Sequence, residues 1–220
     1  MERKLRMTDD GSTTIYIPEM DETYHSTHGA IQEARHVFLK HGLASFSDES
    51  IAVFEMGFGT GLNALLTYQF GEKKYSIDYI GIEAYPVEKE LIDSMNYLKE
   101  VGEEYTSVFE RMHTSKWGER VALSDRFSLT KIHEKIEDYL PEKESIDLVY
   151  FDAFGSRAQG AMWAPSVLEK MHLMLRSGGV LVTYCAMGQF KRDLKALGFS
   201  VSGRPGPPGK REMTVAVKNG

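Results

Sequence analysis

The sequence predicts an α/β fold with a doubly wound, mainly parallel β-sheet, and three observations lead to this class. Strand-like apolar runs alternate with helix-like segments from residue 50 onward. A glycine-rich turn, Gly57 to Gly61, joins an apolar strand to a helix-compatible segment. Acidic residues also follow three of the strand-like runs, at the sheet edge where such folds bind ligands.

The individual elements follow from local patterns of apolar residues. Five runs are expected to be the strands: Ile51–Phe54, Ser76–Ile82, Phe127–His133, Ile146–Phe151 and Val180–Tyr184. Five segments are expected to be helices: Leu62–Phe70, Val87–Val101, Ile136–Leu140, Ser166–Leu175 and Phe190–Leu197. Near the C-terminus we expect a turn, a loop and an antiparallel edge strand, at Arg176–Gly179, Gly203–Gly209 and Arg211–Lys218 respectively.

The first 50 residues do not share this alternation. We expect residues 1–50 to form an N-terminal extension that packs on the domain of residues 51–220 and covers the mouth of its ligand site. Within the extension, Thr13–Ile17 favours a short strand and Gly29–His41 favours a helix with one apolar face. Tyr105–Arg126 is expected to be an irregular insertion, with His113 and Trp117 as packing or surface residues.

Composition and charge limit the class of protein. The 220 residues, 42% of them hydrophobic and 26% charged, suffice for one globular domain with a full core. The single cysteine, Cys185, fits a reducing compartment. Neither a signal peptide nor an apolar run of the ~20 residues that a membrane span needs is visible. We therefore expect a cytoplasmic protein without membrane contact. The net charge of −6 argues against bulk coating of nucleic acid. It leaves room for a local basic patch: Lys191, Arg192, Lys195, Arg204, Lys210 and Arg211.

The turn after the first predicted strand indicates a nucleotide-type ligand. Its glycines, Gly57, Gly59 and Gly61, allow tight turns and a close approach of the backbone to a ligand. The spacing is G-x-G-x-G, with Glu55 two residues before the first glycine, whereas dinucleotide-binding folds have G-x-G-x-x-G. The shorter spacing favours S-adenosylmethionine, which has no pyrophosphate that must bind at a helix N-terminus. The alternative is a glycine-rich turn that binds nothing.

Two further acids end predicted strands. Glu83 lies 22 residues after Gly61, close to the ~20-residue spacing at which such folds place a carboxylate on ribose hydroxyls. Asp152 follows the fourth strand, where it can orient an amine and accept its proton, while Tyr150 and Phe154 can stack a flat substrate. The alternatives are a solvent-facing Glu83 and a structural cap at Asp152. The histidines at 25, 28 and 36 lack a third ligand, so no metal site is expected.

These residues resemble a known family, the methyltransferase domain of MnmC and its standalone form MnmD, which modify the wobble uridine of tRNA. The resemblance covers nearly the whole chain. It rests on these segments: Tyr24–Ser26 with Gly29, Ala30 and Glu33–Phe38; Glu55–Asn63; Phe151–Phe154; Met162 and Trp163; Arg176–Gly179; and Gly209–Met213. The glycine motif is common to class I methyltransferases, whereas Asp-Ala-Phe, Met-Trp and the terminal Lys-Arg-Glu-Met are more specific.

The resemblance implies a class I, Rossmann-like methyltransferase that moves a methyl group from S-adenosylmethionine to the amine of 5-aminomethyl-2-thiouridine in tRNA. It implies that Asp152 is the catalytic residue, the acidic side chain that the family places near the reacting amine. The implied cofactor-binding residues are Glu55, Gly57, Phe58, Gly59, Thr60, Gly61, Asn63, Glu83 and Asp152, and the implied substrate-binding residues are Tyr24, His25, Glu33, Phe154, Trp163, Lys210 and Arg211. Glu134 and Lys135 depart from the family at the position of its adenine contact.

The family's flavin-dependent domain has no counterpart in this sequence, so we expect no FAD, no metal and a separate enzyme that makes the aminomethyl precursor. Three alternatives remain at this point: a small-molecule methyltransferase, an aminopropyltransferase with the same glycine motif, and a non-catalytic nucleotide-binding partner subunit. The acids Glu55, Glu83 and Asp152 count against the last of these, and the basic segment 204–211 favours RNA.

Overall fold

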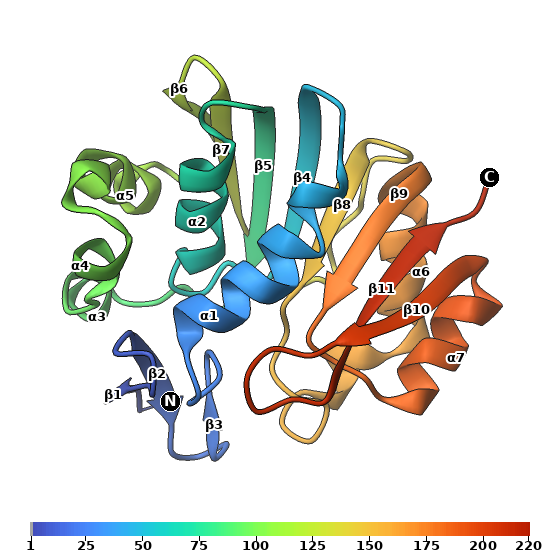
Figure 1. Cartoon of the computed structure of the whole chain (residues 1–220), viewed down its shortest axis with the longest axis horizontal. Helices are drawn as coiled ribbons and strands as arrows, with labels where there is room; N and C mark the ends of the chain where they lie inside the picture. The colour runs from blue at the N-terminus through green and yellow to red at the C-terminus, as the bar shows by residue number, and fades with distance from the viewer. Residues whose placement is uncertain (1) are drawn as a thin grey trace.

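The computed structural model describes residues 2–220, and its centre is an eight-stranded β-sheet (Figure 1). The strand order is β10-β11-β9-β8-β4-β5-β7-β6. Five neighbouring strands in the middle are parallel: β9 (Leu175–Thr183), β8 (Ile146–Phe151), β4 (Ser50–Met56), β5 (Ser76–Glu83) and β7 (Phe127–His133). The predicted α/β class with a doubly wound parallel sheet is therefore confirmed.

Each face of the sheet carries its own apolar core, because successive side chains of a strand point to opposite faces. Val53 belongs to one core and its neighbour Phe54 to the other. The first core is covered by a π-helix (Arg35–Lys40), α2 (Leu62–Gly71) and α5 (Thr106–Thr114). The second is covered by α6 (Pro165–Met174) and α7 (Gly188–Ala196). With both faces covered, the ends of the strands are left as the place for a ligand.

Both outer ends of the sheet are antiparallel. At one end β6 (Arg120–Ser124) pairs with β7, and at the other β11 (Glu212–Lys218) pairs with both β9 and β10 (Phe199–Pro205). The C-terminal strand is thus antiparallel as predicted, but it lies one position inside the edge, and β10 is the edge strand. The cause is that Gly203–Pro205, expected in a loop, extend β10 in register with Glu212–Thr214. An edge strand tolerates Pro205, which has no N–H to donate.

The prediction of one helix over Val87–Val101 is wrong, because the chain forms two short helices, α3 (Lys89–Asp93) and α4 (Tyr97–Val101). Asn96 lies at the break and bonds the N-terminal extension. Its Oδ1 accepts the N–H of Thr13 (2.8 Å), and its Nδ2 donates to the carbonyl of Gly11 (2.7 Å). Local periodicity cannot reveal a contact between residues 83 positions apart.

Two other predicted elements also differ. Ile136–Leu140 forms a turn instead of a helix, and its carbonyl groups accept hydrogen bonds from the ammonium group of Lys170, at 2.6 to 2.9 Å. Arg176–Gly179 is part of β9 instead of a turn before it. Gly178 has φ +78°, and the pairing with β8 shifts register there, so a local irregularity of the strand accommodates the two glycines.

The segment 105–126 is ordered, which corrects the expectation of an irregular insertion. It contains the end of a 3₁₀ turn (Glu103–Tyr105), the amphipathic helix α5 and strand β6. His113 and Trp117 are packing residues, as predicted. The ring of His113 lies 4.6 Å from that of Phe109, and the ring of Trp117 lies 6.2 Å from that of Phe58, between ring centroids.

The first part of the N-terminal extension lies at the carboxyl ends of the parallel strands, below the sheet in Figure 1, whereas its helical part lies against one face of the sheet. It forms a small antiparallel sheet of β1 (Lys4–Met7), β2 (Thr13–Ile17) and β3 (Glu22–Thr23), and the predicted strand coincides with β2. The predicted helix is α1 (Ala30–Ala34) continued by the π-helix, followed by a 3₁₀ turn at Leu43–Ser45. Across residues 2–220, none of the helices has the length and apolar character needed to cross a membrane.

Candidate active site

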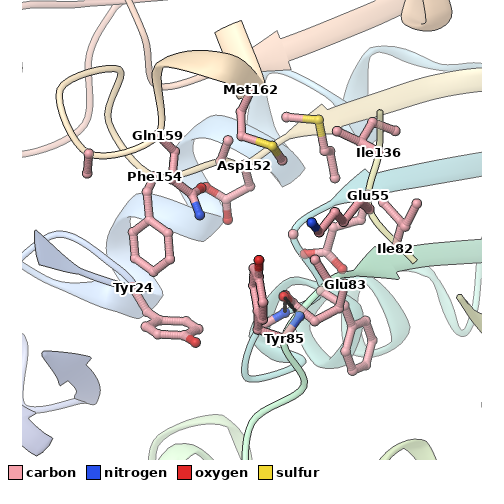
Figure 2. A pocket seen from close by; sticks show the side chains of 18 of the residues that line it. Tyr24, Glu55, Ile82, Glu83, Tyr85, Ile136, Asp152, Phe154, Gln159 and Met162 are labelled. Carbon is pink, nitrogen blue, oxygen red and sulfur yellow. Dashed lines mark hydrogen bonds between the residues drawn. The ribbon is translucent and has the colours of Figure 1, made fainter. Parts of the chain in front are cut away.

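The carboxyl ends of β4, β5 and β8 open into a cavity of about 370 Å³, within the range of small-molecule sites (Figure 2). Its walls come from the glycine turn after β4, the segments after β5, β7 and β8, and the N-terminal extension. The lining includes Arg3, Tyr24, His25, Glu55, Gly57, Phe58, Gly59, Thr60, Asn63, Glu83, Tyr85, Glu134, Lys135, Ile136, Asp152, Phe154 and Met162. The three acids expected at strand ends therefore line one cavity.

The glycine turn is shaped so that side chains would block it. Gly57, Gly59 and Gly61 have φ of +92°, +51° and +72°, in the left-handed region that glycine adopts at low cost. A Cβ on Gly57 would lie 2.5 Å from the carbonyl oxygen of Asp152. The backbone N–H groups of Gly57 and Phe58 both donate to Ile82 O at 3.0 Å, which fixes the turn to the end of β5. The result is a cradle of bare backbone beside Asp152.

Glu83 holds this cradle from the other side. Its Oε2 accepts the N–H of Gly59 (3.0 Å), and its Oε1 accepts the N–H of Tyr85 (2.9 Å). An ionised carboxylate offers about four acceptor positions, so two remain for the hydroxyl groups of a ligand. Glu83 thus lines the cavity at the end of β5, and its contact with a ribose stays a prediction.

Asn63 connects the other two acids. Its Nδ2 donates to Glu55 Oε1 and to Asp152 Oδ2, both at 2.8 Å, while the Tyr79 hydroxyl donates to Glu55 Oε2 (2.8 Å). Burial raises the pKa of Glu55 well above its ordinary value, with Asp152 adding repulsion. The Oδ1 of Asn63 is buried and has no hydrogen-bond partner among the described residues. An unpaired acceptor beside two carboxyl groups fits a ligand that carries an ammonium group.

Asp152 has the environment of a group that exchanges protons near neutral pH. The pKa of Asp152 is raised from an ordinary value of 3.8 to about 7, chiefly by burial and also by the charge of Glu33, while the Asn63 hydrogen bond and the charge of Lys210 oppose the increase. Near neutral pH this carboxyl group can therefore both bind and release a proton. Such a pKa is matched to accepting a proton under physiological conditions.

The predicted substrate residues fall into two groups, and the first lies in this cavity. The ring of Tyr24 meets the ring of Phe154 edge to face, with centroids 4.9 Å apart (Figure 2). Burial raises the pKa of Tyr24 to about 12, so its phenol stays neutral. His25 shares a hydrogen bond with Thr14 Oγ1 through Nδ1 (3.1 Å), and burial lowers its pKa to about 4. Neither residue brings a charge to the site at neutral pH.

The second group lines a neighbouring cavity of about 660 Å³, which lies on the other side of the Asp152–Phe154 segment. Trp163 and Tyr184 form apolar walls, and Lys210 and Arg211 lie in the β10–β11 loop. Two hydrogen bonds join this wall to the backbone between the cavities, from Trp163 Nε1 to Phe154 O (2.8 Å) and from the Tyr184 hydroxyl to Ala153 O (2.7 Å). Glu33 is buried and forms an ion pair with Lys210, so these two predicted substrate residues bind each other.

Some residues of the site escaped prediction. Tyr184 follows β9 directly. The expectation that ligand-binding residues follow parallel strands was applied to acidic residues alone; applied to every residue type at the end of the fifth strand, it would have found Tyr184. Arg3 lines the first cavity and donates to Tyr85 O (2.7 Å), and no local signal predicts this contact across 82 positions. The Thr60 hydroxyl pairs with that of Tyr97 (3.0 Å). Within residues 2–220, no group of three or more His, Cys, Asp or Glu side chains is arranged to hold a metal ion.

Comparisons with known proteins agree with this geometry. The MnmC bifunctional protein of tRNA 5-methylaminomethyl-2-thiouridine biosynthesis from Cupriavidus necator is 32% identical over 216 residues, which is 91% of this chain and 32% of that protein. Its counterpart from Cupriavidus metallidurans is 31% identical over 229 residues, 96% of this chain and 33% of that protein. The chain thus spans about a third of the length of these relatives.

A solved structure shows the same fold. MNMC2 from Aquifex aeolicus matches with a TM-score of 0.79 and 22% identity, covering 98% of this chain and 69% of that one. A family model described as S-adenosyl-L-methionine-dependent methyltransferase matches residues 95–219, more than half of the chain. The chain therefore belongs to the family of S-adenosyl-L-methionine-dependent methyltransferases.

Proposed function

We propose that this methyltransferase modifies the amine of 5-aminomethyl-2-thiouridine at the wobble position of tRNA. The observation that carries the proposal is the place of Asp152. Its carboxyl group lines the cofactor-sized cavity, and the carbonyl groups of the next two residues accept hydrogen bonds from Tyr184 and Trp163, which line the second cavity. A methyl donor in one cavity and an amine from the other would meet at this carboxyl group. The printed names of the relatives point to the same uridine modification.

In this proposal the first cavity holds S-adenosylmethionine, which supplies an electrophilic methyl group when bound. Glu83 binds the ribose hydroxyl groups through its free acceptor positions. Gly57, Phe58, Gly59 and Thr60 line the cavity and are proposed to present backbone to the middle of the ligand, with Glu55 and Asn63 at its ammonium end. Gly61 does not line the cavity and is proposed to act through the shape of the turn. Residues 134–137 line the cavity beyond β7. They are proposed to contact the adenine of the cofactor, although Glu134 and Lys135 depart from the family at this position.

Asp152 is proposed to hold and deprotonate the acceptor. An amine attacks only as the neutral base, so the proton of its ammonium form has to leave. A carboxyl group with a pKa of about 7 is ionised often enough to accept a hydrogen bond from the amine and take up that proton. The rings of Tyr24 and Phe154 lie on the same side of the cavity as Asp152, where they can stack on the uracil ring of the acceptor and fix its orientation.

The RNA backbone is proposed to lie along the rim of the second cavity, where Arg211 is exposed. Residues 1–50 are proposed to act as an extension that closes the cofactor cavity, since Arg3, Tyr24 and His25 all contribute to its wall. The reaction consumes an aminomethyl uridine, so a separate reaction must supply that group, and a link to the enzyme that makes it is part of the proposal.

The test is methylation of tRNA from cells that lack this modification step, followed by mass spectrometry of the nucleosides. We expect a mass gain of one methylene unit on 5-aminomethyl-2-thiouridine and no product with Asp152→Asn. Methylation confined to small amines, or transfer of an aminopropyl group to them, would replace the proposal by one of the alternatives. Binding of S-adenosylhomocysteine without turnover on any tRNA would identify a non-catalytic partner.

A further inference from the structure

Glu33 and Lys210 form a partly enclosed ion pair between two distant parts of the chain. Glu33 lies on α1, Lys210 lies in the β10–β11 loop, and the lysine ammonium group donates to Glu33 Oε1. Exposure of the two side chains is 10% for Glu33 and 32% for Lys210. The other carboxylate oxygen of Glu33 accepts the N–H of Ser26 (2.9 Å), so Glu33 is held from both sides. A pair this enclosed keeps a fixed geometry better than a surface pair.

Lys210 also connects this pair to the backbone next to Asp152. Its ammonium group lies 3.9 Å from the centre of the Tyr184 ring, within the range of a cation–π contact. The Tyr184 hydroxyl donates to the carbonyl of Ala153. A continuous series of contacts therefore runs from α1 through Lys210 and Tyr184 to the residue after Asp152.

The charges around Asp152 come from all the elements packed against it. Glu33 and Lys210 approach from α1 and the loop, and Asn63 donates from α2. Glu55 lies beyond Asn63 on β4, and the neutral phenols of Tyr79, on β5, and Tyr184, directly after β9, are also near. Within this set Lys210 is the single cation. Glu33 and Lys210 act on Asp152 with opposite signs.

We infer that Glu33 and Lys210 are positioning residues for the acceptor, a role different from direct binding of substrate. The pair holds the β10–β11 loop against α1 and thereby fixes the wall formed by Tyr184. It also sets the charge balance that Asp152 meets when the amine arrives. The kinetic consequence depends on the proposed function, whereas the effect on Asp152 does not.

The first experiment therefore follows Asp152 directly, without substrate. Carbon-13 NMR of the aspartate carboxyl groups, with Asp152→Asn to assign the signal, gives its titration midpoint in the ligand-free protein. Glu33→Gln removes a nearby negative charge and should move the midpoint to lower pH. Lys210→Met removes a positive charge and should move it to higher pH, while Lys210→Arg should restore the original value.

A matched control comes from the same region of the fold. Lys191 on α7 pairs with Glu212 at 2.7 Å, and Glu212 begins β11 directly after the loop. Lys191→Met breaks an ion pair of the same type without approaching Asp152, so the midpoint should not move. Unchanged midpoints in Glu33→Gln and Lys210→Met, or shifts in the same direction, would overturn the inference.

The second experiment measures methylation of tRNA as a function of pH. In kcat/KM the free acceptor amine titrates identically with every variant, so a difference between variants reports on the free protein. We expect the rising limb of kcat/KM to move to lower pH in Glu33→Gln and to higher pH in Lys210→Met. A purely structural role would lower kcat/KM by the same factor at every pH. If no variant methylates tRNA, the proposed function fails, while the NMR midpoints still decide the role of the pair.

Discussion

Replacing Asp152 by Asn should make the protein more stable and less active, and both effects have the same cause. The carboxyl group lies in a poorly solvated pocket, which raises its pKa to about 7. In the wild-type protein Asp152 accepts a hydrogen bond of 2.8 Å from Asn63. Asparagine keeps the shape of aspartate and an oxygen that can accept this bond, but it carries no charge. The substitution therefore removes the cost of holding a charge there, together with the group proposed to take the proton.

The magnitude and the pH range follow from the pKa values. The pKa of Asp152 rises from 3.8 in the unfolded chain to about 7 in the fold, and each pKa unit corresponds to about 1.4 kcal/mol. Because the unfolded chain ionises first, wild-type stability falls as pH rises from about 4 to 7 and then levels off. Above pH 7 the variant should therefore unfold with a free energy larger by as much as about 4 kcal/mol, and the gain should vanish toward pH 4.

Two assays check this prediction. Urea unfolding at pH 8 and pH 4.5 measures the gain in stability, and single-turnover methylation measures activity, which should fall by about 10²-fold or more. In the wild-type protein the rate should rise through pH 7 as Asp152 loses its proton; the variant should lack that inflection. Normal turnover in Asp152→Asn, or lost turnover with no stability gain at pH 8, would refute the reasoning.

The remaining predictions concern the cofactor cradle, the RNA rim and the break in the helix. Gly57→Ala should abolish S-adenosylhomocysteine binding in calorimetry, because its Cβ would lie 2.5 Å from a backbone oxygen; Gly118→Ala, at a similar φ of +79° with no atom within 4 Å, should bind normally. Arg211→Glu should weaken tRNA binding and reduce its salt slope by about 1 in filter binding, whereas Arg126→Glu at the opposite edge of the sheet should not. Asn96→Ala should lower the free energy of unfolding by about 1–3 kcal/mol in urea titration, since it leaves polar groups of the extension unpaired; a loss below measurement error would contradict this.

The sequence predicted the parts of the fold that depend on local pattern. The strands at Phe127–His133 and Ile146–Phe151 were placed to the residue, because buried parallel strands are short apolar runs between polar segments. Predictions failed where distant contacts decide. The helix break at Asn96 is fixed by the N-terminal strands, and the order of β10 and β11 is fixed by pairing that extends through Pro205.

The same division holds for the site. Acids at strand ends could be expected to meet because the carboxyl ends of parallel strands share one edge, and Glu55, Glu83 and Asp152 do line one cavity. The pairing of Glu33 with Lys210 joins residues 177 positions apart, and no spacing rule connects them. Sequence similarity marked both residues, but only the fold shows that they bind each other.

The charge balance of the cavity leads to a last prediction, that binding of S-adenosylmethionine releases protons. Of the charges that act on Asp152, Glu33 disfavours its ionised form and Lys210 favours it, while burial moves the neighbouring Glu55 toward its neutral form. A cationic ligand beside Asp152 stabilises the ionised carboxylate and lowers its pKa, so near pH 7 part of its proton population must leave. Calorimetry in buffers of different ionisation enthalpy measures this release. It should be present with S-adenosylmethionine and smaller with S-adenosylhomocysteine, whose sulfur is uncharged. In Asp152→Asn it should be reduced, and the difference between the two ligands should disappear; equal release with both ligands in the wild-type protein would show that the sulfonium charge does not act on Asp152.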